Sequence, residues 1–115
     1  MKSISILGVF VADLCFIGDK IPSKGQTILG KKHVVGPGGK GSNQAIAASR
    51  LNGEVSFITK VGKDSHSEMA FNLYKEAGVK THSIIQDKNL FTGVAGIMID
   101  EDGNNAINIV SGDFV

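Results

Sequence analysis

Apolar residues recur along the chain with two different periods, and the two periods predict different elements. Spacings of three and four residues, as among Met69, Ala70 and Leu73, are typical of a helix and predict one over residues 65–77. Small apolar residues at similar spacing predict another helix over residues 42–52. Runs rich in β-branched residues predict strands. These strands are expected at residues 3–11, 14–17, 55–61, 79–86, 92–100 and 106–110, with one or two more within residues 26–35.

The order of these elements predicts an α/β fold. A strand, a helix that stops at Asn52-Gly53 and a further strand follow one another at the spacing of an α/β unit. The first strand, which is largely apolar and rich in β-branched residues, is expected to be buried and central in a sheet. Residues 101–105 hold Asp-Gly and Asn-Asn between two apolar runs, which is typical of an antiparallel hairpin. The chain is therefore expected to be the early part of a longer α/β protein.

A glycine-rich stretch at residues 36–45 precedes the first predicted helix. Glycine lets a ligand approach the main chain, and a helix start offers free N–H groups with a partial positive charge. Lys40 adds a full charge and Asn43 an amide that both donates and accepts, while Ser42 suits the N-cap of the helix. The stretch is interpreted as a cradle for an anionic or polyhydroxylated molecule, with a plain turn as the alternative. Asp13, after the first strand, is either a ligand residue or an ordinary loop carboxylate.

Composition narrows the classes of partner. The 115 residues include 15 glycines and have a net charge of +1, so nothing favours a nucleic-acid or membrane partner. The first apolar run is too short and too interrupted for a signal peptide or a membrane span. The single cysteine, Cys15, cannot form an internal disulfide, which favours a cytoplasmic location.

Several common site motifs do not fit. Residues 36–41 match a dinucleotide-binding glycine pattern in letters, but they do not follow the first strand directly. A nicotinamide-binding protein is therefore a weak interpretation. The Walker A pattern fails because Gly41 follows Lys40 where Ser or Thr is required. The three histidines lack ligand spacing, so no metal site is expected.

Five motifs follow one another along the chain: Gly8-x-x-x-x-Asp13, Pro22-x-x-Gly25-x-Thr27, Gly38-Gly39-Lys40-Gly41-Ser42-Asn43-Gln44-Ala45, Gly62-x-Asp64 and Thr92-Gly93-x-Ala95. In this order they resemble the N-terminal part of the ribokinase-like (PfkB-type) carbohydrate kinases, and within that family they most resemble the ribokinases. The glycine stretch is similar to the first signature of the family.

The resemblance implies an α/β/α sandwich with a small β-sheet lid, formed here by residues near 14–17, 26–35 and 92–110. It implies transfer of a phosphoryl group from ATP to a sugar hydroxyl, with Mg²⁺ and a monovalent cation, and a homodimer formed through the lid sheet. Asp13, Gly39, Lys40 and Asn43 match positions that contact sugar hydroxyls. The implied substrate-binding set also includes Val11, Gly38, Gly41 and Ile109, the last packing on the apolar face of the sugar.

Two differences from the family pattern affect the expected function. Val11 stands where ribokinases usually have a sugar-binding Asn, so the substrate is expected to be a different sugar or one less polar at that point. The Gly-x-Gly-Asp motif that holds the family's catalytic base is not found in residues 1–115. The chain alone is therefore expected to lack kinase activity. A non-catalytic sugar-binding or interaction fragment is the alternative function.

Overall fold

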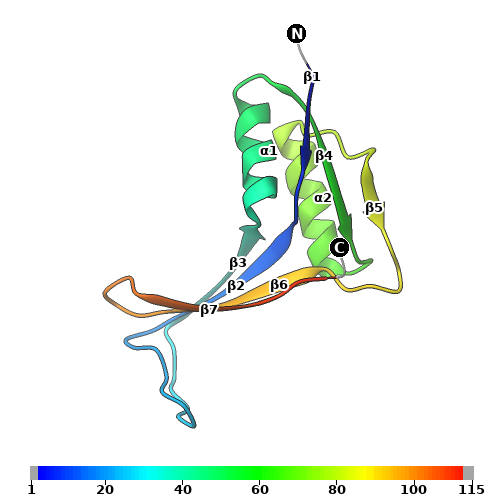
Figure 1. The fold of residues 1–115 in the computed structure, drawn as a ribbon. Helices are drawn as coiled ribbons and strands as arrows, with labels where there is room; N and C mark the ends of the chain where they lie inside the picture. Colours follow the sequence, from blue (N-terminus) through cyan, green and yellow to red (C-terminus); the bar gives the residue numbers. More distant parts are fainter. Residues whose placement is uncertain (1–2, 113–115) are drawn as a thin grey trace.

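The computed structural model describes residues 3–112, which form two sheets and two helices. A parallel three-stranded sheet has the order β1-β4-β5, with β1 at Ser3–Leu7, β4 at Glu54–Val61 and β5 at Ile84–Gln86. Helices α1 (Lys40–Arg50) and α2 (Ser65–Ala77) cover one face of this sheet (Figure 1). This layered part of the molecule is called the body below.

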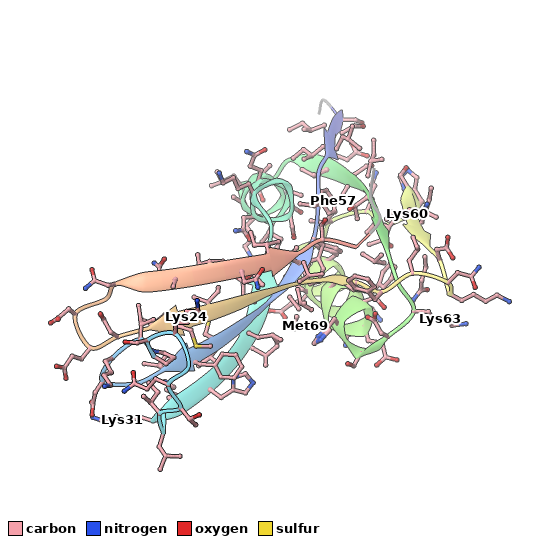
Figure 2. The ribbon with its side chains drawn as sticks, turned by 60° about the horizontal axis from the view of Figure 1, so that its bottom comes forward. Lys24, Lys31, Phe57, Lys60, Lys63 and Met69 are labelled. Atoms are coloured by element: carbon pink, nitrogen blue, oxygen red, sulfur yellow. The ribbon has the colours of Figure 1, made fainter. Side chains whose placement is uncertain are left out.

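The second sheet extends away from the body (Figure 1). Its four strands are β2 (Val11–Ile17), β3 (Lys32–Gly38), β6 (Gly93–Ile99) and β7 (Asn105–Val110), in the order β3-β2-β6-β7. Strands β2 and β6 are parallel, whereas β3 and β7 pair antiparallel with them at the two edges. Lys24 and Lys31 lie in the loop at the end of this sheet that is farthest from the helices (Figure 2).

The core of the body forms around Tyr74 of α2. Phe10 and Phe57 contact its ring edge-on, with centroid distances of 6.2 Å and 5.4 Å. The hydroxyl of Tyr74 shares a 2.7 Å hydrogen bond with the Ser42 hydroxyl on α1, so the one polar end of the ring is satisfied inside the core. Burial raises the pKa of Tyr74 to about 12, and the hydrogen bond to Ser42 opposes that rise only in part. This packing fixes the start of α1 against α2.

Several predicted elements are confirmed. Helix α2 has the predicted bounds, with Asp64 as its N-cap and Gly78 in the left-handed conformation after its end. Strand β4 and the final hairpin of β6 and β7 also lie where the sequence predicted them. Strand β5 is shorter than predicted, because Lys80 forms only a single bridge to Ser56 before the strand proper begins at Ile84.

The prediction of one strand over residues 3–11 is wrong. The chain leaves the body sheet after Leu7 and enters the other sheet at Val11, so the apolar run holds parts of two strands. The break is at Gly8, where a Cβ atom would lie 2.8 Å from the Cα of Gly41. This close contact of two backbones requires glycine on both sides. Within the described residues β1 is also a largely exposed edge strand, not the buried, central strand that was predicted.

The glycine stretch differs from prediction as well. The strand expected within residues 26–35 begins at Lys32 and continues to Gly38, so the first half of the expected loop, residues 36–38, belongs to strand β3. Helix α1 begins at Lys40 with Gly39 at the N-cap position, and Ser42 lies buried inside the helix, not at its cap. Ser42 is drawn into the core because its hydroxyl bonds to Tyr74.

Candidate functional site

A hollow of about 680 Å³ lies where the four-stranded sheet meets the start of α1 and the end of β1. All residues of the substrate-binding set expected from the sequence line it. The lining residues are Leu7, Gly8, Val9, Val11, Asp13, Gly38, Gly39, Lys40, Gly41, Asn43, Gln44, Ala95, Ile97, Ile107, Ile109 and Ser111. The hollow therefore brings together residues that are separated by up to about a hundred positions in the sequence.

The four-stranded sheet forms one wall, through side chains that share a face. Asp13 of β2 is in register with Ala95 of β6, and Ala95 is in register with Ile109 of β7. Residues in register point to the same side of a sheet, so the Asp13 carboxylate and the Ile109 side chain lie on one surface with the small Ala95 between them. Ile109 is 60% exposed, so its apolar side chain is available to a ligand.

Three glycines, at the end of β3 and the start of α1, keep this part of the hollow's border free of side chains. A Cβ atom at Gly38 would lie 2.2 Å from a carboxylate oxygen of Asp13, and one at Gly39 would lie 2.2 Å from the carbonyl oxygen of Val9. Gly39 also has a φ of 96°, which other residues rarely adopt. At Gly41 the obstacle is the backbone of Gly8. Glycine at these positions lets the main chain itself border the hollow.

The first turn of α1 supplies the polar groups of this part of the border. Lys40 and Asn43 are both exposed and both line the hollow. Within the described residues no side chain caps this helix, and its first turn holds no acidic residue. The turn therefore presents free N–H groups and the positive end of the helix dipole together with the Lys40 ammonium.

Asp13 is the acid of the hollow, and its surroundings favour an external hydrogen-bond donor. Burial raises the pKa of Asp13 above its ordinary value of 3.8, and no hydrogen bond within the described residues offsets that rise. An ionised carboxylate that is partly removed from water without a donor is unfavourable. A ligand hydroxyl would supply that donor.

Sequence reasoning missed the apolar part of the wall. Ala95, Ile97 and Ile107 were not predicted as site residues, although they lie on the same face as Asp13 and Ile109. The alternation of Ile107 and Ile109 along the predicted hairpin was a usable signal, since residues two apart share a face. Gln44 was missed although it follows the predicted Asn43 directly.

A second hollow, of about 540 Å³, lies under the loop between β2 and β3. Its lining includes Phe16, His33 and Met98 and shares no residue with the first. Phe16 and His33 stack at a centroid distance of 4.8 Å, and His33 Nδ1 lies 2.9 Å from the carbonyl oxygen of Cys15, which it meets as a donor. None of the residues predicted for the site lies there.

Two features are absent from residues 3–112. No group of three or more His, Cys, Asp or Glu side chains is placed to hold a metal ion. No helix in this part of the chain has the length and apolar character needed to cross a membrane.

The fold and the hollow together define an α/β protein whose four-stranded second sheet borders a candidate binding site. Comparison with protein families matches residues 1–114 to the pfkB family of carbohydrate kinases. The chain belongs to this family.

Characterised relatives agree with this assignment. The ribokinase of Bacillus subtilis is 38% identical over 112 residues, which are 97% of this chain and 38% of that protein. A deoxyribokinase of Salmonella typhi is 32% identical over 95% of this chain and 36% of its own length. The structure of Arabidopsis thaliana ribokinase complexed with ribose and ATP superimposes with a TM-score of 0.85 and 32% identity, covering 95% of this chain and 36% of that one. The predicted fold class is confirmed, and the chain spans somewhat more than a third of the length of these relatives.

Proposed function

We propose that this chain forms the sugar-binding half of the active site of a ribokinase-like sugar kinase. The observation that supports this most strongly is the gathering of the whole predicted substrate-binding set around one hollow. These residues come from β2, β3, α1 and β7, so their convergence is a property of the fold and not of one sequence motif.

The chemistry of the walls matches a sugar. Asp13 accepts protons from sugar hydroxyls, Asn43 both donates and accepts, and Lys40 donates. The glycine backbone at residues 38–41 allows hydroxyls to approach main-chain N–H groups. Ile107 and Ile109 pack against the C–H face of the ring, which gives the hollow one polar and one apolar side as a sugar requires.

Val11 narrows the class of sugar. It is 7% exposed and lines the hollow two residues from Asp13, where its side chain offers no hydrogen bond. A sugar hydroxyl left unpaired there would weaken binding by about 1–3 kcal/mol. We therefore propose a pentose that lacks a hydroxyl at this point as a substrate alongside ribose. The deoxyribokinase among the relatives shows that the family includes kinases named for such a sugar.

Phosphoryl transfer itself is assigned to residues other than those of this chain. We propose ATP as the phosphoryl donor, with Mg²⁺ and a monovalent cation as in the family that the sequence resembles. Within residues 3–112 no three His, Cys, Asp or Glu side chains lie together as a metal-ligand cluster. We expect the isolated chain to be inactive, since transfer depends on positioned charges around the phosphates.

We further propose that the four-stranded sheet is the lid of the site and forms a homodimer interface. Every residue of its edge strand β7 is exposed, and an exposed strand edge can pair with a second chain. A cytoplasmic location fits the lone cysteine. Sedimentation equilibrium that found only monomers at high concentration would contradict the dimer.

Isothermal titration calorimetry of the chain with D-ribose and 2-deoxy-D-ribose tests the proposed function. Saturable heat with either sugar, and none with a hexitol of similar polarity, is the expected result. Binding of neither sugar would contradict the proposal. A coupled ADP-release assay on the same sample separates a complete kinase from a sugar-binding fragment: we expect no turnover, and turnover would disprove the assignment of catalysis to other residues.

A further inference from the structure

Asp64 lies outside the sugar hollow and joins the body to the start of the four-stranded sheet. Its Oδ1 accepts hydrogen bonds from the backbone N–H of Ser67, at 2.9 Å, and from the hydroxyl of Thr92, at 2.8 Å. Its Oδ2 accepts one from the backbone N–H of Thr92, also at 2.9 Å. One carboxylate therefore caps α2 and holds Thr92 by both of its donors.

The side chain of Thr92 is fixed at this position by burial and by a further hydrogen bond. It is 2% exposed, and its hydroxyl also accepts a 3.1 Å hydrogen bond from the backbone N–H of Gly62. Gly62 in turn lies so close to the chain before Thr92 that a Cβ atom there would be 2.4 Å from the carbonyl oxygen of Leu90. We call the contact of Asp64 and Gly62 with Thr92 the clamp. Lys63, labelled in Figure 2, lies between the two clamp residues of the body.

The clamp holds the start of β6, the strand whose pairing positions the sheet side of the proposed sugar site. Thr92 directly precedes β6, a central strand of the four-stranded sheet, whose register places Gly93 opposite Val11 and Ala95 opposite Asp13. Strand β6 in turn holds β7 with Ile109. The other tight crossings between body and sheet, at Gly8 and Gly39, are backbone contacts of glycine. Within residues 3–112, the side-chain hydrogen bonds between the body and the start of this sheet all involve Thr92.

We propose that Asp64 is a positioning residue that fixes the four-stranded sheet over the hollow by holding Thr92, without touching the sugar. The expected effect of Asp64 on sugar affinity rests on the proposed sugar-binding function. Its expected effect on the position of the four-stranded sheet does not. Weakening the clamp should loosen β6 and β7 while the body keeps its packing.

Two variants break the clamp by different routes. Asp64→Asn keeps an oxygen for capping Ser67, because Asn is also a good N-cap, but its amide nitrogen cannot accept the second hydrogen bond from Thr92. Thr92→Val keeps the shape and removes the hydroxyl, and Thr92→Ser is the conservative variant that restores it. Tyr74→Phe is the matched control, because it removes one buried hydrogen bond inside the body only.

Hydrogen exchange and ribose calorimetry are measured on all four variants. Asp64→Asn and Thr92→Val should speed exchange in β6 and β7 about tenfold or more relative to β4, and raise the Kd for ribose about tenfold, with Thr92→Ser close to the unaltered chain. Tyr74→Phe should speed exchange in the body and leave the ratio of β6 to β4 unchanged.

Each outcome decides the proposal. Equal acceleration of β4 and β6 in the clamp variants would show a general loss of stability and overturn it. Faster exchange of β6 with unaltered ribose affinity would overturn the positioning role. If the unaltered chain bound no sugar, the proposed function would fail, and the exchange ratio alone would then decide whether the clamp fixes the sheet. If one clamp variant failed to fold, the other would decide.

Discussion

The carboxylate of Asp13 gives the hollow its strongest preference for a ligand that donates hydrogen bonds. Burial raises the pKa of Asp13, and within the described residues no donor compensates. Hydroxyl groups of a bound sugar would favour the ionised form and so lower that pKa again. Of the residues around the hollow, Asp13 is therefore expected to contribute most to the affinity for the proposed sugar.

Asp13→Asn should weaken ribose binding about 10- to 100-fold, because the amide replaces one charged acceptor by a donor. Isothermal titration calorimetry measures the loss of ribose affinity. Asp19→Asn is the control, since Asp19 pairs with Lys31 in an exposed contact far from the hollow. Equal affinities for the unaltered chain and Asp13→Asn would show that Asp13 does not contact the sugar.

Val11→Asn should raise the preference for ribose over 2-deoxyribose about tenfold. The new amide would meet a hydroxyl that valine leaves unpaired, at a buried position on the hollow. The measurement is the ratio of the two dissociation constants. Val11→Leu, which changes volume but not polarity, serves as the control. A ratio unaffected by Asn would show that no sugar hydroxyl lies at this position.

The residues of the candidate site were largely predictable because they lie in short, ordered motifs. Asp13, Lys40 and Asn43 line one hollow as the sequence suggested. The apolar wall was harder to predict because it depends on strand register. Ile97 and Ile107 join the site only through the pairing of β6 with β2 and β7, which no local pattern specifies.

At the level of elements, the glycine stretch is a strand end and a helix start with almost no loop between them. Sequence rules favoured a loop, since glycine and proline weaken strands. Strand β3 tolerates them because it is an edge strand, paired only with β2. The burial of Ser42 was likewise beyond local rules, because its partner Tyr74 is 32 residues away.

Gly39→Ala should lower the free energy of unfolding by about 2 kcal/mol or more, because the new Cβ would meet the Val9 carbonyl oxygen at a strained φ. Chemical denaturation measures this. Gly36→Ala is a matched control in the same stretch, since a Cβ there meets nothing within 4 Å. Similar losses in the two variants would show that the stretch is not as tightly packed as described.

Helix α2 should show a pH dependence that comes from Asp64. Burial raises the pKa of Asp64, but hydrogen bonds from Thr92 and Ser67, together with the nearby His66, outweigh it and hold the pKa below 3.8. A lowered folded-state pKa stabilises the fold above the unfolded-state pKa, and this contribution is lost as pH falls through the folded value.

The expected difference in unfolding free energy between the unaltered chain and Asp64→Asn is therefore largest near neutral pH and shrinks as the pH falls below 3.8. Urea denaturation at a series of pH values measures it. A difference that stayed constant into acid would mean that the Asp64 carboxylate gains nothing from folding.

In the whole molecule, the body has a well-packed core, and the four-stranded sheet depends on contacts with the body for its position. Among residues 3–112, the large buried aromatic residues all belong to the body, whereas every residue of β7 is exposed. The fold class followed from the order of helices and strands. The passage of the chain from one sheet to the other at Gly8 could not be predicted, because the residues on both sides of Gly8 have the same strand-forming composition. That passage is what creates the hollow.

Titration of the ¹⁵N-labelled chain with D-ribose, followed in ¹H–¹⁵N correlation spectra, tests the central claim most directly. The account predicts saturable shifts concentrated at the amides of Asp13, residues 38–43 and Ile109, and none around Phe16 and His33 in the second hollow. An unchanged spectrum, or shifts centred on Phe16 and His33, would contradict it.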